Sequence, residues 1–160
     1  MSLSQLWKAL ETVMDPEIPV LTLIDIGVIR SAEIRNGVTH VEITPTYSGC
    51  PAMQEMEKDI EKALKDAGFA QVSITTVLSP AWTNDSITEK GRKALLDYGI
   101  APPEQTTADK SVLQGHPRNI SCPRCRSTTT EMVSQFGSTP CKALYRCKEC
   151  LEPFDYFKCI

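Results

Sequence analysis

Two pairs of cysteines near the end of the 160-residue chain constrain its fold more than any other feature. The motifs CPRC (122–125) and CKEC (147–150) each hold two thiols, and 21 residues separate them. A C-x-x-C turn lets two thiolates approach one ion, and two such turns on adjacent hairpins complete a tetrahedral site. The spacing therefore predicts a four-cysteine metal site made by Cys122, Cys125, Cys147 and Cys150.

The residues around these pairs predict a zinc ribbon, a small β domain, over residues 118–160. TTTEMVS and ALYRC read as strands, and Gly137 and Pro140 lie between them. A segment this short buries too little surface to fold alone, so a bound ion would supply much of its stability, on the order of 10 kcal/mol. We expect a structural Zn²⁺, although all-thiolate sites also hold iron or an iron–sulfur cluster.

Six of the seven cysteines fall in the last 44 residues, and in a reducing compartment such clustering favours metal binding over disulfides. Cys141 and Cys159 are the two that the knuckles do not use. A second site or another ligand set involving them stays open. The simpler interpretation, a small buried apolar group, is favoured for Cys159, and both interpretations stand for Cys141. His116 is expected to be solvated.

Charge divides the chain in the same place. Residues 1–116 carry 10 basic and 16 acidic side chains, whereas residues 117–160 carry 7 basic and 4 acidic ones. This asymmetry predicts two modules. The basic residues of the second module permit nucleic-acid binding, but a net charge of +3 favours it only weakly. They could equally dock the second module onto the acidic first one.

The chain has no apolar run of 18 residues, and its first residues lack a basic segment followed by an apolar one. We therefore expect a cytoplasmic protein without a membrane span.

Residues 1–100 show the periodicity of an α+β domain. Apolar spacing predicts helices, β-branched runs predict strands, and the pair Asn36-Gly37 predicts a tight hairpin turn. A helix at 85–98 would be capped by Asp85. The expected order is helix 3–14, strands 29–35 and 38–44, helix 51–68, strand 70–78 and helix 85–98. This order predicts a small three-stranded sheet with helices on one face, followed by a linker at 101–117 and the four-cysteine ribbon.

One cysteine, Cys50, stands apart in the stretch TYSGCPAM. If Pro51 is the first helical residue, Cys50 is the N-cap, where backbone N–H groups and the helix dipole lower a thiol pKa. Serine or aspartate would cap better, so the helix does not require cysteine here. The alternative is a thiol packed under a loop.

Several motifs resemble two known families. DPEIPVLTLIDIG, YSGCPAM and SPAWTND resemble the SufT-like iron–sulfur assembly domain. Together with CPRCRS and FGSTPCKALYRCKEC, nearly the whole chain resembles the PaaD family, the D proteins of bacterial phenylacetate degradation. The one departure is Arg126, where glycine is more usual after a knuckle.

The resemblance implies an accessory or maturation factor for the multicomponent phenylacetyl-CoA 1,2-epoxidase, with its oxygenase and reductase components as partners. It implies that iron or a transient iron–sulfur cluster binds at Cys50. It also assigns the remaining motif residues to this site: Asp15, Glu17, Asp25, Thr46 and Trp82. As an alternative, Asp15 and Glu17 cap local turns and Trp82 belongs to the core.

A single thiol cannot hold a cluster alone, so Cys50 would work in pairs across a homodimer, with ligands of a target, or with a small thiol. Another hypothesis is a stoichiometric, non-catalytic component of the epoxidase complex that acts in electron transfer or regulation. The chain shows no nucleophile–base–orienter set and no phosphate loop, and its two histidines, His40 and His116, lie far apart. We do not expect a self-sufficient enzyme.

Overall fold

The computed structural model describes residues 1–103 and 120–158. Its contacts divide the chain into two compact units, residues 1–91 and 92–160, and we describe each by itself. The sequence predicted that the first domain ends at residue 100. Most of the predicted linker, from residue 104 onward, lies outside the described residues, whereas Ala101 lies in a strand.

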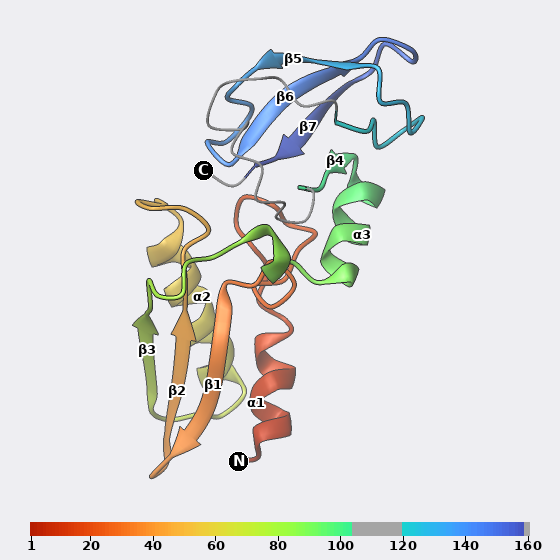
Figure 1. The fold of residues 1–160 in the computed structure, drawn as a ribbon. Helices are drawn as coiled ribbons and strands as arrows, with labels where there is room; N and C mark the ends of the chain where they lie inside the picture. Colours follow the sequence, from red (N-terminus) through yellow and green to blue (C-terminus); the bar gives the residue numbers. More distant parts are fainter. Residues whose placement is uncertain (104–119, 159–160) are drawn as a thin grey trace. The chain divides into compact units, whose positions relative to one another are not determined.

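The first unit is an α+β fold, as predicted. Its elements are α1 (Leu3–Leu10), β1 (Ile29–Arg35), β2 (Val38–Ile43), α2 (Met53–Asp66), β3 (Val72–Thr76) and the 3₁₀ turn η1 (Asn84–Ser86). The three strands form one sheet in the order β1-β2-β3. Helices α1 and α2 cover the same face of this sheet (Figure 1).

The hairpin between β1 and β2 confirms the predicted turn. Asn36 and Gly37 both have positive φ, 51° and 81°, as a tight primed turn requires. Strands β1 and β2 pair antiparallel from Arg35↔Val38 onward. On β2, Val41 and Ile43 are buried while Glu42 between them is exposed, so one face of the hairpin packs on the core.

Strands β2 and β3 pair in parallel, and α2 connects them. This crossover brings the ends of both strands and the start of α2 to one end of the unit, where the loop 44–52 leaves the sheet. Helices and sheet share a core that includes Leu6, Leu10, Ile60 and Leu64, all fully buried. The loop that holds Cys50 is therefore anchored on both sides by regular structure.

The third helix starts later than predicted. The residues expected to begin it form η1 instead, and α3 spans Glu89–Tyr98 across the boundary of the two units. The hydroxyl of Thr88 accepts the N–H of Gly91 at 3.0 Å, so Thr88, and not Asp85, caps this helix. Helix α1 also differs from the prediction, since it ends at Leu10 and not at residue 14. The chain turns back after it, and Met14 forms a β-bridge with Thr22.

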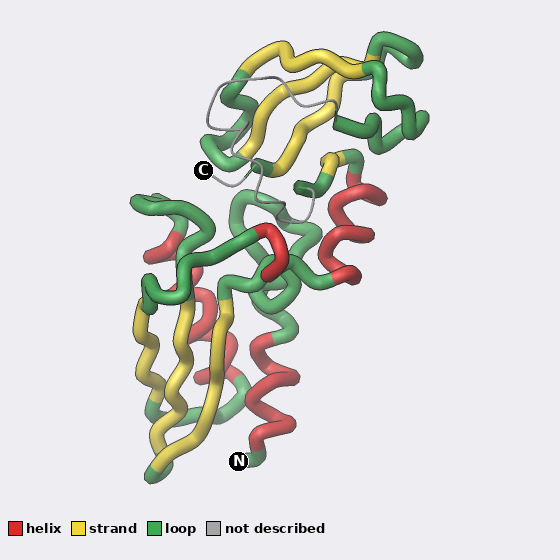
Figure 2. The backbone as a smooth tube through the Cα atoms, viewed as in Figure 1, coloured by secondary structure: helices red, strands yellow, loops and turns green. Residues whose placement is uncertain are grey.

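The second unit is a four-stranded sheet in the order β4-β7-β6-β5 (Figure 2). Its strands are β4 (Ile100–Ala101), β5 (Thr130–Ser134), β6 (Lys142–Cys147) and β7 (Pro153–Phe157). Strands β5, β6 and β7 form an antiparallel ribbon, and β4 joins β7 in parallel. A small core forms around Tyr145, which stacks on Phe154 and meets Tyr156 edge-on.

Among the described residues, none of the helices is both long and apolar enough to cross a bilayer.

Gly27 allows the segment 84–88 to approach the loop before β1. Its φ is +77°, and a Cβ at this position would lie 2.5 Å from the carbonyl oxygen of Ser86. We therefore expect Gly27→Ala to lower the free energy of unfolding by about 3 kcal/mol, from backbone strain and overpacking together. Gly37→Ala is the matched control, because its φ is +81° but nothing lies within 4 Å. It should cost only about 1–2 kcal/mol.

Urea unfolding followed by tryptophan fluorescence measures the difference, since Trp7 and Trp82 both belong to the first unit. Equal losses for the two variants would contradict the predicted role of the contact with Ser86.

Candidate functional site

Four thiols of the second unit converge as their spacing predicts. The sulfur atoms of Cys122, Cys125, Cys147 and Cys150 all lie within 4.8 Å of one another. The Sγ–Sγ distance is 3.7 Å between Cys122 and Cys150 and 3.5 Å between Cys125 and Cys147. A tetrahedral ion with metal–sulfur bonds of about 2.3 Å requires Sγ–Sγ distances of about 3.8 Å. The group therefore fits one tetrahedral ion.

The two knuckles have the same backbone design. The N–H of Cys122 donates to the carbonyl of Ser127 at 2.9 Å, and the N–H of Cys147 donates to the carbonyl of Glu152 at 3.0 Å. Each knuckle is followed by a residue with left-handed backbone, Arg126 at φ 65° and Leu151 at φ 63°. The conformation that favours glycine is thus present, although neither residue is glycine.

The pKa values of two thiols in this group shift in opposite directions. The backbone N–H of Cys150, together with the N–H of Glu149 and the neighbouring thiols, outweighs burial and lowers the pKa of Cys147 to about 7. For Cys150, the backbone N–H of Glu152 favours the thiolate, but burial and the three neighbouring thiols outweigh it and raise the pKa to about 12. One thiolate therefore hinders the ionisation of the next. A bound cation would remove this conflict, and metal binding would release the remaining protons.

Cys141 lies outside this group. It is buried, and its Sγ is 3.0 Å from the hydroxyl of Thr139. This position favours the interpretation of Cys141 as a small buried group. Cys159 and His116 lie outside the described residues.

Cys50 does not cap α2, which corrects the prediction. The helix begins at Met53 with Ala52 at its cap position, and residues 50–53 form a turn in which the carbonyl of Cys50 accepts the N–H of Met53 at 3.4 Å. Pro51 belongs to this turn rather than to the helix. The thiol therefore lies two residues before the cap position of the helix, and it is half-buried.

The pKa of Cys50 is raised, whereas the sequence predicted a lowered one. Burial is the largest cause. The N–H of Ala52 and the hydroxyl of Tyr47 favour the thiolate, while the carboxylates of Glu17 and Asp15 oppose it. Near neutral pH the group is thus a thiol, surrounded by hydrogen-bond donors and by two acidic side chains. The structure adds Tyr47, which belongs to the TYSGCPAM stretch but was not among the predicted site residues.

Asp15 holds the turn that brings these carboxylates to Cys50. It is buried, and its Oδ1 accepts the N–H groups of Glu17 and Ile18 at 2.8 and 2.7 Å. Asp15 also contributes to a groove beside α2, whose acidic lining includes Glu55 and Asp59. The turn-capping role proposed as an alternative is therefore present, and it coexists with proximity to the thiol.

Asp25 is occupied by a buried network. Its carboxylate accepts the hydroxyls of Thr22 and Thr88 at 2.8 and 2.9 Å and pairs with Lys90 at 3.2 Å. Burial raises the pKa of Asp25, but these three partners outweigh it and leave the pKa below its usual value.

Trp82 and Thr46 are also buried. The indole N–H of Trp82 donates to the carbonyl of Ile26 at 2.8 Å. Trp82 and Asp25 thus join the loop 22–27 to the segment 82–90, whereas Asp15 and Glu17 lie close enough to Cys50 to influence its pKa.

A curated protein of Escherichia coli K12, which is named as a subunit of 1,2-phenylacetyl-CoA epoxidase, is 46% identical to this chain and matches 98% of it and 92% of its own length. Residues 106–158 match the family described as the PaaD zinc beta ribbon domain. The chain belongs to the PaaD family. This assignment confirms the resemblance found in the sequence, and the ribbon of this PaaD protein carries the four-cysteine group.

The first unit of the PaaD chain has its own relatives. Residues 3–75 match the family described as iron-sulfur cluster assembly protein. The Bacillus subtilis protein "Fe-S protein maturation auxiliary factor YitW" is 32% identical over 54% of the chain and 86% of its own length. A Bacillus anthracis structure of a "Domain of Unknown Function DUF59" covers 57% of the chain and 89% of its own length, with a TM-score of 0.54 at 23% identity. That structure supports the fold alone.

The four-thiol geometry predicts that Cys125→Ser lowers bound metal and unfolds the second unit. Removing one ligand weakens the hold on an ion whose binding free energy stabilises the small ribbon. Metal content by mass spectrometry and hydrogen exchange of β5–β7 amides measure both effects. Cys141→Ser is the control, since this cysteine lies outside the group, and it should keep the metal. Full metal retention in Cys125→Ser would contradict the assignment.

The surroundings of Cys50 predict an unusual pH profile. We expect the alkylation rate of Cys50 to rise with pH through a midpoint above that of a free thiol, because its pKa is raised and only the thiolate reacts. Glu17→Gln should move the midpoint down by removing a neighbouring negative charge. Glu33→Gln on β1 should leave it unchanged. Peptide-resolved mass spectrometry after pulses of iodoacetamide follows the reaction, and a midpoint insensitive to Glu17→Gln would be the contrary result.

Proposed function

We propose that this PaaD protein is an accessory maturation factor for a phenylacetyl-CoA 1,2-epoxidase, and that Cys50 carries an iron–sulfur cluster or iron as cargo. The E. coli relative is named as an epoxidase subunit, and two curated relatives of the first unit, from B. subtilis and Porphyromonas gingivalis, are named as Fe-S protein maturation auxiliary factors. Delivery of iron or a cluster to the oxygenase or reductase component would account for both the similarity to an epoxidase subunit and the similarity to maturation factors.

The observation that carries the proposal is the unequal distribution of thiols. The second unit gathers four of them around one point, whereas Cys50 of the first unit is a single half-buried thiol. Four thiolates complete a tetrahedral shell and retain an ion, so we assign a structural Zn²⁺ to the ribbon. A single thiolate leaves a cargo incompletely ligated and therefore exchangeable. A second chain, a ligand of the target or a small thiol would complete the shell.

The acidic neighbours of Cys50 fit this role. Asp15 and Glu17 disfavour the thiolate while the site is empty of cations, and they attract a cation that approaches. Arrival of iron would therefore be coupled to loss of the thiol proton. Tyr47 and the N–H of Ala52 would then donate to the charged sulfur. Asp25, Thr46 and Trp82 act in this proposal by holding the loops around the site.

A second candidate is a permanent, non-catalytic component of the epoxidase, acting in electron transfer or regulation. The name of the E. coli relative, which describes a subunit of that enzyme, favours it. Nucleic-acid binding is less favoured, because Arg124 and Lys148 of the ribbon form ion pairs with Glu152 and Glu131. Whether it is a maturation factor or a permanent component, we propose a cytoplasmic protein that does not catalyse a reaction alone.

Anaerobic reconstitution tests the role of Cys50. We expect Cys50→Ser to lose cluster binding and cluster transfer to the apo-reductase at least tenfold, while the metal of the ribbon stays bound. Cys141→Ser should transfer normally. Unchanged cluster binding and unchanged epoxidase maturation with Cys50→Ser would refute the proposal. Turnover that requires the chain at fixed stoichiometry, even with fully matured components, would favour the permanent component instead.

A further inference from the structure

Strand β3 leaves one edge of the first sheet open. Its N–H and C=O groups at odd positions face β2, as shown by the bonds from Thr39 N–H to Gln71 and from Val77 N–H to Ile43. Backbone groups alternate along a strand, so those of Val72, Ile74 and Thr76 point away from the sheet. Among the described residues, no strand pairs with this side of β3.

The opposite edge of the same sheet is protected, whereas β3 is not. Strand β1 has an irregular register at Arg30 and carries the charged residues Glu33 and Arg35. Bulges and charges are the usual devices that prevent a further strand from pairing with an edge. Strand β3 has the sequence VSITT, without proline, charge or bulge, and Leu78, two residues beyond its end, is 71% exposed.

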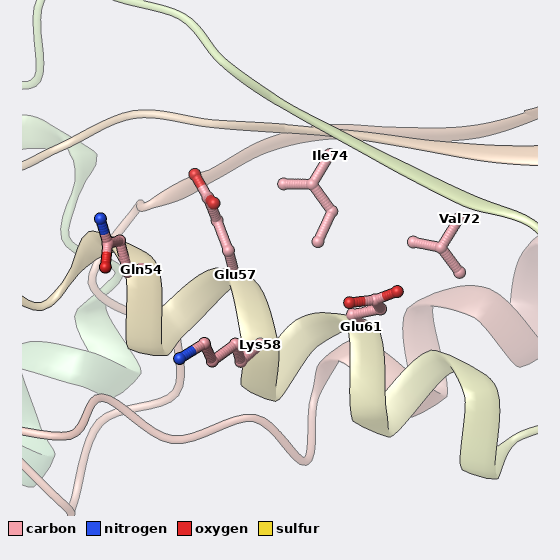
Figure 3. A pocket seen from close by; sticks show the side chains of 6 residues that line it. All are labelled: Gln54, Glu57, Lys58, Glu61, Val72 and Ile74. Carbon is pink, nitrogen blue, oxygen red and sulfur yellow. The ribbon is translucent and has the colours of Figure 1, made fainter.

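A groove runs beside this open edge, between β3 and α2. It is lined by Val72 and Ile74 from the strand and by Gln54, Glu57, Lys58 and Glu61 from the helix. Figure 3 shows both strand residues pointing toward the helix, with Glu57 extending toward Ile74. Thr76 lies on the same face, since its hydroxyl contacts Glu57 at 3.2 Å. Val72 and Ile74, two of the residues with outward backbone groups, thus also form the apolar floor of the groove.

The charges of the groove select its occupant. Its two carboxylates outnumber its one lysine, and the first unit carries 13 acidic against 7 basic side chains. Lys and Arg could lay their aliphatic stems on Val72 and Ile74 and bring their charges to Glu57 and to Glu61, which also forms an exposed ion pair with Lys65 at 2.6 Å. A second copy of this acidic unit would be repelled. An edge roughly 17 Å long is also too short to bury the roughly 1,200 Å² of a stable dimer.

We infer that the open edge of β3 binds an extended segment of a partner protein, which adds a fourth strand to the sheet and carries Lys or Arg at every second position. The segment pairs with the backbone of Val72, Ile74 and Thr76, and its basic side chains fill the groove against α2. This surface requires no cargo at Cys50, so it stands independently of the proposed maturation role.

The test adds a capped seven-residue peptide of alternating arginine and threonine to the full chain. NMR measures the hydrogen exchange of the backbone amides. We expect binding to slow hydrogen exchange of the amides of Val72, Ile74 and Thr76 at least tenfold, with no change at Ser73 and Thr75. The peptide with glutamate in place of arginine should bind at least tenfold more weakly. Raising the salt concentration should weaken binding of the basic peptide, because salt screens the charge attraction.

Two charge-reversed variants locate the site on α2. Glu57→Lys with Glu61→Lys should weaken peptide binding at least tenfold. The control variant is Glu55→Lys with Asp59→Lys, which makes the same charge change at the same spacing on α2 but lies in the other groove. Its affinity for the peptide should stay within threefold of that of the unmodified chain.

Three results would overturn the inference. The first is absence of peptide binding, and the second is loss of binding only in the Glu55 and Asp59 variant. The third is concentration-dependent protection of Val72, Ile74 and Thr76 without peptide, which would assign the edge to a second copy of the chain.

Discussion

The buried carboxylate of Asp25 joins two segments of the first unit that are far apart in the sequence. It accepts hydroxyl groups from Thr22 on one side and from Thr88 on the other, and the N–H of Thr88 donates to the backbone carbonyl of Asp25 at 2.9 Å. Gly27 and Gly91 permit this approach, because a side chain at either would meet the opposite backbone within 3 Å. The two loops are not paired by a sheet or a helix. Hydrogen bonds to this buried carboxylate fix their arrangement instead.

The chain places its cysteines in two different settings, one in each unit. In the ribbon, paired turns bring four sulfur atoms into a closed shell, and the small sheet is built around them. In the first unit, parallel pairing of β2 and β3 directs a single thiol to the end of the sheet, beside two carboxylates. The two units differ in the number of thiols that meet at one place, which is four in the ribbon and one in the first unit.

Local signals predicted most of the fold. The Asn36-Gly37 turn, the helix between the second and third strands and the cysteine knuckles depend on contacts close in sequence or on a fixed spacing, and the structure confirms them. The predicted cap of α2 was wrong because residues 50–53 form a separate turn, and the predicted pKa of Cys50 was wrong because it depends on burial and on tertiary contacts. The motif showed a cysteine before a helix, but not the extra turn at Pro51 or the approach of Glu17 from a distant loop. Thr88 was missed as a cap because the helix was expected to begin at Asp85, where the structure has the 3₁₀ turn η1.

The residues that follow the two knuckles, Arg126 and Leu151, both have left-handed backbone beside the four-cysteine group. Glycine would adopt this backbone more easily, yet the chain has an arginine at one turn and a leucine that is 61% exposed at the other. Both directly follow hydrogen-bonded turns that present the sulfur atoms, so their backbone is held at fixed positions relative to those atoms. Because the backbone at both positions is already fixed, little backbone entropy would be lost if either side chain contacted another molecule.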